Sequence, residues 1–303
     1  MPRVVRLTWS AAAWARSPAR PWKRRRHGLN YAAEGTGLEL VPRRNALVTN
    51  DDGIDSPGLV VLADAALRAG LDVVVAAPAR QSSGASAGII AKTREGRPLI
   101  DRRQLPDLPG LEAYAVEAQP GYIVRVAVRG WLDPVPQLVL SGINHGANVG
   151  RAILHSGTVG AALTAAVNGV RGLAVSLDVG LRPVHPPHWD TAGHLLSQVL
   201  EILVGAPAGT ALSLNVPDRP VETLRELRLA ALARFGIVQT RVDRVEDGQL
   251  HLDQVELDIP PEPGTDSALL AAGHPTLTAL ESVCEAANPM LPQWLTSAGQ
   301  PSA

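Results

Sequence analysis

Two adjacent aspartates, Asp51 and Asp52, follow a short apolar run and precede a glycine. Ser83 and Asn144 lie in two further polar clusters, each of which also follows an apolar run. Adjacent carboxylates raise each other's pKa, so a fold tolerates them best beside a cation. Carboxylate, hydroxyl and amide oxygens are the ligands of Mg²⁺ or Mn²⁺ rather than of zinc or copper. The residue types therefore predict a magnesium or manganese site, of the kind that also handles phosphate.

Each cluster also has a simpler interpretation. An Asp-Asp-Gly segment after a strand is often a turn in which the aspartate accepts backbone N–H bonds, and Ser83 and Asn144 could equally be loop residues. The metal site is favoured because three such clusters follow three strands of one predicted sheet. His145 and His155 flank the predicted site and could contact phosphate or simply face solvent.

A second candidate site begins at Ser156 and continues through Gly157 and Thr158 to Gly160. Exposed N–H groups and hydroxyls at the start of a helix can hold an anion. The same residues could only cap the helix. Position alone leaves both interpretations open.

Several familiar catalytic motifs are absent from the sequence. The first strand–helix turn is not G-x-G-x-x-G, and neither a phosphate-binding G-x-x-x-x-G-K-[ST] loop nor a G-x-S-x-G nucleophile turn occurs. The two lysines, Lys23 and Lys92, are not placed for a phosphoacceptor receiver domain, which needs a lysine at a late strand end.

The pattern of apolar residues predicts alternating strands and helices. Strands are expected at 46–50, 72–78, 113–117, 138–141, 173–177 and 211–216, and helices at 56–70, 121–128, 158–170 and 190–204. This alternation is typical of an α/β fold with a doubly wound, mostly parallel sheet. Ligands of such sheets bind outside the carboxyl ends of the strands, where the polar clusters lie. Beyond residue 217 the pattern is weaker and suggests strands at 226–230, 234–242 and 250–257 in a hairpin-rich lobe, with 267–272 and 275–280 closing the fold.

Composition sets the class of protein. The chain has 303 residues, of which 46% are hydrophobic and 19% are charged. This composition is typical of a globular protein. No apolar run approaches the roughly 18 residues of a membrane span, and a single cysteine, Cys284, excludes a disulfide framework. Aromatic residues are only 3%, so nucleic-acid binding through aromatic platforms is not expected. We expect a cytoplasmic protein.

Charge divides the chain at about residue 44. Residues 1–44 hold ten Lys or Arg residues and two acidic residues, whereas residues 45–303 hold 18 Lys or Arg residues and 27 acidic residues. We expect 1–44 to be a disordered extension, with a targeting, nucleic-acid-binding or membrane-surface role as alternatives. Residues 283–303 are expected to form a loose tail. His185 and His188 lie in a Pro-rich loop and are expected at the surface.

The polar clusters and their neighbours carry a family resemblance. The segments concerned, in order, are Val48-Thr49-Asn50-Asp51-Asp52-Gly53-Ile54, Ala77-Pro78, Ser83-Gly84, Ser141-Gly142-Ile143-Asn144, Ser156-Gly157-Thr158-Val159-Gly160, Asn215-Val216-Pro217 and Thr265-Asp266. Over about residues 45–280 the sequence resembles the SurE survival-protein family, the metal-dependent 5′/3′-nucleotidases.

The resemblance implies a fold, a reaction and a set of site residues. It implies a Rossmann-like three-layer core over 45–282 with a C-terminal extension at about 218–282, assembled as a homodimer or tetramer. It implies phosphatase activity that converts nucleoside 5′/3′-monophosphates to nucleoside and phosphate, with one divalent ion, Mg²⁺ or Mn²⁺, per subunit. The implied metal ligands are Asp51, Asp52, Ser83 and Asn144, and the residues implied around the phosphate are Asn50, Gly142, Ser156, Gly157 and Thr158.

Roles within that site follow from the same resemblance. Asp51 is the first candidate to assist the attacking water, while Ser156 and Thr158 would hold charge on the phosphoryl oxygens. Asn50 is a further catalytic candidate beside these three residues. His145 is a candidate for substrate binding.

The sequence departs from the family at residues expected behind the metal ligands. Ala79, Ala87 and Thr164 stand where the family has an acid, a histidine and an acid, and the 118–122 segment is also altered. Loss of such groups can cost roughly 10–100-fold in affinity or activity. The alternative is therefore a non-catalytic metal- or nucleotide-binding protein with a regulatory or structural role as an oligomer.

Overall fold

The computed structural model describes residues 44–284, apart from 181–182, 184, 236–237, 247–248 and 257–261. Between 238 and 256 only the backbone is described. The predictions of a disordered extension over 1–44 and a loose tail over 283–303 fall outside the described residues, except for Arg44, Val283 and Cys284. Those two predictions, and the limits of the C-terminal lobe, stay predictions.

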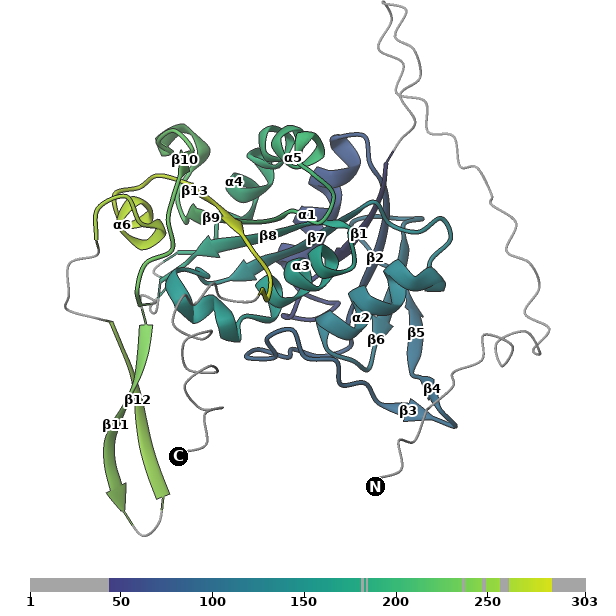
Figure 1. The fold of residues 1–303 in the computed structure, drawn as a ribbon, viewed down its shortest axis with the longest axis horizontal. Coiled ribbons are helices and arrows are strands. Elements are labelled where there is room, and N and C mark those ends of the chain that lie inside the picture. The colour runs from purple at the N-terminus through teal and green to yellow at the C-terminus, as the bar shows by residue number, and fades with distance from the viewer. Residues whose placement is uncertain are drawn as a thin grey trace, which may run out of the picture. The chain divides into compact units, whose positions relative to one another are not determined.

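A nine-stranded, mostly parallel sheet forms the centre of the fold (Figure 1). Only the β9–β13 and β5–β6 pairs are antiparallel. In spatial order the strands are β10 (Arg228–Leu229), β13 (Thr276–Leu280), β9 (Ala211–Pro217), β8 (Arg171–Asp178), β7 (Leu138–His145), β1 (Asn45–Thr49), β2 (Asp72–Pro78), β6 (Glu112–Val116) and β5 (Ile100–Arg103).

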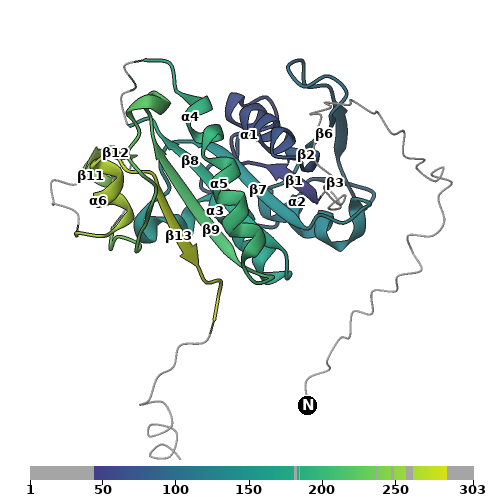
Figure 2. The ribbon, with the colours of Figure 1, turned by 90° about the horizontal axis from the view of Figure 1, so that it is seen from above.

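Helices cover both faces of this sheet (Figures 1 and 2). On one face α1 (Pro57–Arg68), α4 (Trp189–His194) and α5 (Leu196–Gly205) pack over a core that includes Ala46 and Val48 of β1. On the other face α2 (Pro120–Val126) and α3 (Gly157–Val167) pack over Leu47. The predicted three-layer, doubly wound α/β fold is therefore confirmed.

The β1–α1–β2 unit shows why the sequence folds this way. Pro57 occupies the first turn of α1, where its missing N–H costs nothing, and Gly70 follows the helix with φ +84°. Ser56 takes the N-cap position as its sequence position suggests, but its side chain makes no capping bond. β1 and β2 pair in parallel from Asn45 opposite Asp72.

Other elements differ from the sequence-based expectation. The predicted 190–204 helix is two helices, α4 and α5, and the predicted 226–230 strand pairs only over Arg228–Leu229. The short strands β3 (Thr93–Arg94), β4 (Arg97–Pro98) and β5 were not predicted. β11 (Val238–Glu246) and β12 (Gln249–Glu256) form an antiparallel hairpin with its own two-stranded sheet, and α6 (Asp266–Ala271) precedes β13.

The sheet order places the functional loops together. β1 lies between β7 and β2, so the direction of winding reverses beside it and the loops that follow all three strands meet at one edge. Next in the chain, the 3₁₀ segment η3 (Gly150–His155) leads into α3 at the same edge. Among the described residues, no helix is long and apolar enough to cross a membrane.

Candidate metal and phosphate site

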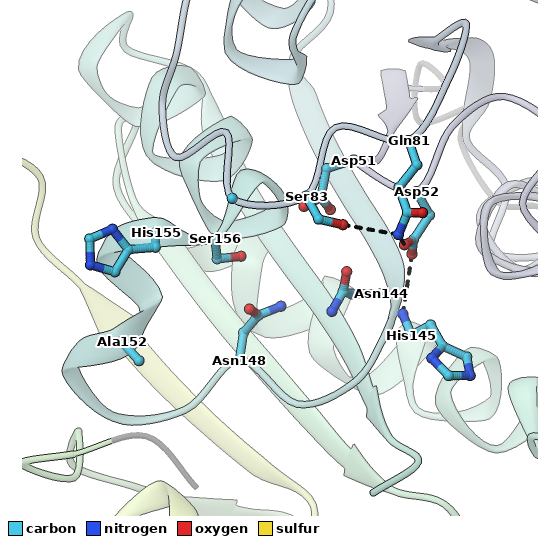
Figure 3. Close-up of a pocket in the computed structure, with 11 residues that line it drawn as sticks. Asp51, Asp52, Gln81, Ser83, Asn144, His145, Asn148, Ala152, His155 and Ser156 are labelled. Carbon is cyan, nitrogen blue, oxygen red and sulfur yellow. Dashed lines mark hydrogen bonds between the residues drawn. The ribbon is translucent and has the colours of Figure 1, made fainter. Parts of the chain in front are cut away.

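A cavity of about 380 Å³ opens at the edge where β1, β2 and β7 end (Figure 3). All four residues predicted as metal ligands line it. The complete lining is Asp51, Asp52, Gln81, Ser83, Gly84, Asn144, His145, Asn148, Ala152, His155 and Ser156. Three segments far apart in the sequence thus contribute their polar side chains to a single space.

Asp51 is the most buried of the predicted ligands, with 4% of its surface exposed. Burial raises the pKa of its carboxyl group, and the neighbouring Asp52 raises it further. The hydroxyl of Thr158 and the N–H of Gly157 donate to the carboxyl and partly offset this rise. Asp51 is therefore held by the first turn of α3 while its charge remains poorly compensated.

Asp52 is held by two donors from different loops. The backbone N–H of His145 donates to Oδ2 at 3.1 Å, and the Gln81 amide donates to Oδ1 at 3.5 Å. The same Gln81 amide lies 2.9 Å from Ser83 Oγ, so it links two predicted ligands (Figure 3). Burial raises the pKa of Asp52 as well. Gln81 was not predicted as a site residue, because its only signal in the sequence is its place in a polar loop.

The side chain of Asn144 has a defined orientation. Its Nδ2 donates to the carbonyl of Gly146 at 2.8 Å, which turns Oδ1 toward Thr158, 3.2 Å from its hydroxyl. The amide therefore presents an oxygen on the side where the Asp51 carboxylate lies.

Two glycines are required by close packing. A Cβ at Gly157 would lie 2.7 Å from Asp51 Oδ2. Gly142 has φ +138°, and a Cβ there would lie 2.2 Å from the carbonyl oxygen of Val175. Both glycines allow the backbone to approach the site, and their predicted contacts with substrate stay predictions.

Asn50 and Thr158 are placed differently from the other predicted residues. Asn50 is fully buried, and its amide closes the loop by donating to Gly53 O at 3.0 Å and accepting from Gly53 N at 3.1 Å. Thr158 is also fully buried, with its hydroxyl bonded to Asp51. The structure gives these side chains structural contacts, and their predicted contacts with phosphate stay predictions.

Ser156 combines both interpretations that the sequence left open. It is the N-cap of α3, where its Oγ accepts from the N–H of Val159 at 3.1 Å. It also lines the cavity, beside His155. Since the capping bond uses an oxygen lone pair, the hydroxyl proton remains available to a ligand.

The electrostatics of the site fit a divalent cation. Within the part of the chain that the structure describes, neither Asp51 nor Asp52 forms an ion pair with a lysine or arginine. Buried carboxylates without a compensating charge are costly. A hard cation bound by carboxylate, hydroxyl and amide oxygens would compensate both.

The three positions expected to differ from the family, Ala79, Ala87 and Thr164, are accommodated in the fold. The hydroxyl of Thr164 donates to the carbonyl of Gly160 within α3, at 2.6 Å. Ala79 packs against the core and its N–H donates to Val116 O at 2.8 Å. Ala87 is exposed in the loop that contacts Gly160.

Comparison with known proteins identifies the family. The sequence model of the family described as survival protein SurE matches residues 46–238. A protein named 5′-nucleotidase SurE from Moorella thermoacetica is 36% identical over 240 residues, which cover 77% of this chain and 88% of that protein. A protein of the same name from Dehalococcoides mccartyi is 34% identical over 77% of this chain and 87% of its own length.

A solved structure shows the same fold. The crystal structure of the SurE protein from Aquifex aeolicus superposes with a TM-score of 0.68, covers 83% of this chain and 99% of its own, and is 24% identical in sequence. With the family match over residues 46–238 and relatives above 30% identity, the chain belongs to the survival protein SurE family.

Proposed function

We propose that this protein is a metal-dependent phosphomonoester hydrolase that converts nucleoside monophosphates to nucleoside and phosphate. The observation that carries the proposal is the convergence of Asp51, Asp52, Ser83 and Asn144 on one cavity. The names of the relatives, 5′-nucleotidase SurE, support the choice of substrate class.

The donor set is the basis for the proposed cofactor, one Mg²⁺ or Mn²⁺ per chain held by those four residues. When bound, such an ion supplies Lewis-acid polarisation of a phosphoryl oxygen and lowers the pKa of water. Asp52 and Ser83 serve mainly to position it, and the Gln81 amide, which contacts both, orients them.

Asp51 is the proposed acceptor of the proton from the attacking water. Its carboxyl group lines the cavity, and a carboxylate beside a water can take that water's proton as a general base. Thr158 orients this carboxyl through its hydrogen bond to Oδ1.

The phosphate is proposed to bind between the aspartates and the start of α3. Ser156 lines the cavity there with a hydroxyl proton free to donate. His145 and His155 line the same cavity and can donate to phosphoryl oxygens or the leaving oxygen.

Assembly and location are further parts of the proposal. The β11–β12 hairpin pairs only with itself in its sheet, and an isolated two-stranded hairpin is marginal in water, which supports a homo-oligomer in which it finds a partner. Size-exclusion chromatography with light scattering would separate a monomer from the expected dimer or tetramer. The cytoplasmic location expected from the sequence stays part of the proposal.

Phosphate release from a panel of nucleoside 5′- and 3′-monophosphates tests the activity. We expect release with Mn²⁺ or Mg²⁺, loss of release with EDTA, and loss in Asp51→Asn. Asp64→Asn is the matched control, because Asp64 lies on α1 in an exposed ion pair with Arg68. Binding of metal and nucleotide without turnover would contradict the proposal and favour a regulatory binding protein.

A further inference from the structure

A second group of potential metal ligands lies outside the candidate active site. His185 and His188 belong to the loop between β8 and α4, and Asp218 follows β9 directly. One ligand atom from each of the three lies within 4.8 Å of the others. The sequence predicted the two histidines as surface residues, and their convergence on Asp218 could not be read from it.

The Asp218 carboxylate is the centre of this group. Its side chain is only 5% exposed. Oδ1 lies 2.9 Å from His188 Nδ1 and accepts the backbone N–H of His188 at 2.7 Å. Oδ2 lies 3.7 Å from His185 Nδ1, beyond hydrogen-bonding distance, and the same Nδ1 lies 3.1 Å from the carbonyl oxygen of Pro186. A buried carboxylate thus faces two imidazole nitrogens, one at each oxygen.

Charge and geometry favour a metal ion among these three groups. The imidazole rings contact each other edge to face, with centroids 4.7 Å apart. Two protonated imidazoles at this distance would repel each other, whereas a dication would neutralise the carboxylate and accept a lone pair from each neutral ring. Two imidazoles and one carboxylate form a set of protein ligands typical of zinc.

The surroundings allow the ion to enter and to complete its coordination. The two histidines line a cavity of about 580 Å³, which has room for water as a further ligand. His185 is 42% exposed and His188 32% exposed, so both can be reached from solvent.

We propose that His185, His188 and Asp218 form a second metal site, selective for Zn²⁺ or a similar imidazole-preferring ion over Mg²⁺. This site goes beyond the proposed nucleotidase function and lies on different residues. Its ligands join the β8–α4 loop to the end of β9, so the bound ion fixes that loop on the sheet.

The loop leads directly to the candidate active site. Trp189 follows His188, and its ring centroid lies 5.9 Å from that of His145, a residue whose backbone N–H donates to Asp52. A Cβ on Gly58 would lie 3.0 Å from Trp189, so the indole is closely packed against α1. An ion that holds His188 therefore also holds the residue packed beside His145.

Zinc counting on the full-length chain tests the site. The protein is purified without a polyhistidine tag in the Asp51→Asn background, which disables the oxygen-ligand site, and is dialysed against Zn²⁺ with Mg²⁺ in excess. We expect one Zn²⁺ per chain and a rise in Tm with Zn²⁺. His185→Ala and His188→Ala should each weaken binding by more than about tenfold, about 1.4 kcal/mol.

Two more variants make the result decisive. Asp218→Asn keeps an acceptor oxygen but removes the charge, so it should fold and lose Zn²⁺. His194→Ala removes an exposed histidine of α4 and should bind Zn²⁺ as the parent does. Equal binding by the parent, His188→Ala and Asp218→Asn, or no binding by the parent, would overturn the proposal.

Discussion

Thr158 acts on the candidate site through other residues. It is fully buried, and its hydroxyl contacts the two predicted ligands Asp51 and Asn144. One hydroxyl on the first turn of α3 therefore orients two ligands from different elements, Asp51 after β1 and Asn144 at the end of β7. Groups that orient metal ligands in this way typically contribute about 10–100-fold to affinity or activity.

Thr158→Val should weaken Mn²⁺ binding by roughly 10–100-fold, because it keeps the shape but removes the donor to Asp51. Thr158→Ser keeps the hydroxyl and should restore most of the affinity. Calorimetric titration of each variant with Mn²⁺ measures the effect. A valine variant that binds as tightly as the parent would show that Thr158 has no positioning role.

The two aspartates should make metal-free stability depend on pH. Burial raises the folded-state pKa of Asp51 and Asp52, so the folded protein binds their protons more tightly than the unfolded chain does. Their contribution to stability is present below the usual aspartate pKa and is lost as pH rises through the raised values. At neutral pH in EDTA, Asp51→Asn should therefore have a higher Tm than the parent, because it removes a buried carboxylate whose charge is poorly compensated.

Thermal melts from pH 4 to 8 in EDTA, repeated with Mg²⁺, measure this linkage. Metal should stabilise the parent most at the higher pH, where protons no longer compete for the carboxylates, and should not stabilise Asp51→Asn. A parent whose Tm exceeds that of Asp51→Asn in EDTA at neutral pH would be the contrary result.

The sequence allowed some site residues to be predicted and concealed others. Asp51, Ser83 and Asn144 could be selected because each follows a strand whose apolar run is easily recognised. The role of Gln81 depends on the rotamer that directs its amide to Asp52 and Ser83. Such a contact arises only from tertiary packing and leaves no periodic signal.

At the scale of elements, the approach of α3 to β1 depends on Gly157. A Cβ at this position would lie 2.7 Å from both Cβ and Oδ2 of Asp51, so the whole aspartate side chain, and not only its end, would have to move. The helix start and the aspartate therefore fit together only with glycine.

Gly157→Ala should displace Asp51 or the first turn of α3 and reduce metal-dependent phosphate release by at least about tenfold, since small misplacements in a site are costly. Gly205→Ala at the end of α5 is the control, because a Cβ there meets nothing within 4 Å. Steady-state assays and far-UV spectra of both variants would separate site damage from unfolding. Full activity in the Gly157 variant would refute the packing argument.

A second connection between elements runs through Asp266 at the start of α6. It is 1% exposed, and its carboxylate accepts the N–H groups of Gly150, Ala233 and Ser267. Gly150 begins η3, which carries His155 to the cavity. The C-terminal part of the chain thus supports one wall of the site.

Asp266→Asn should destabilise the fold by about 1–3 kcal/mol, because an NH₂ group would face a buried N–H. Asp64→Asn, in an exposed pair, should change stability by less than about 0.5 kcal/mol. Urea unfolding of both variants measures the difference. Similar unfolding free energies for the two variants would contradict the assigned role of Asp266.

Elements with a strong local pattern were predictable and elements set by tertiary contacts were not. The buried run of β2 was predicted with the bounds it has, Asp72–Pro78. β5 is largely exposed and polar and pairs at the sheet edge, so no apolar pattern marks it. The nearest helix-weakening residue to the break between α4 and α5 at Leu195 is Gly193, and because a helix tolerates an isolated glycine, propensity alone does not indicate the break.

For the molecule as a whole, the charge balance bears on how it binds an anion. Residues 45–303 carry 18 basic and 27 acidic residues, and the cavity itself holds two poorly compensated aspartates. A phosphate group would be repelled by this surface unless a cation were bound. The central claim is therefore that one divalent ion lies among the oxygens of Asp51, Asp52, Ser83 and Asn144.

Anomalous diffraction from a crystal of the protein grown with Mn²⁺ tests that claim most directly. We expect one strong anomalous peak per chain in the cavity, within about 2.3 Å of oxygens from these four residues, and no such peak in Asp51→Asn. A Mn²⁺ peak elsewhere with this cavity empty, or a peak unchanged in Asp51→Asn, would contradict it.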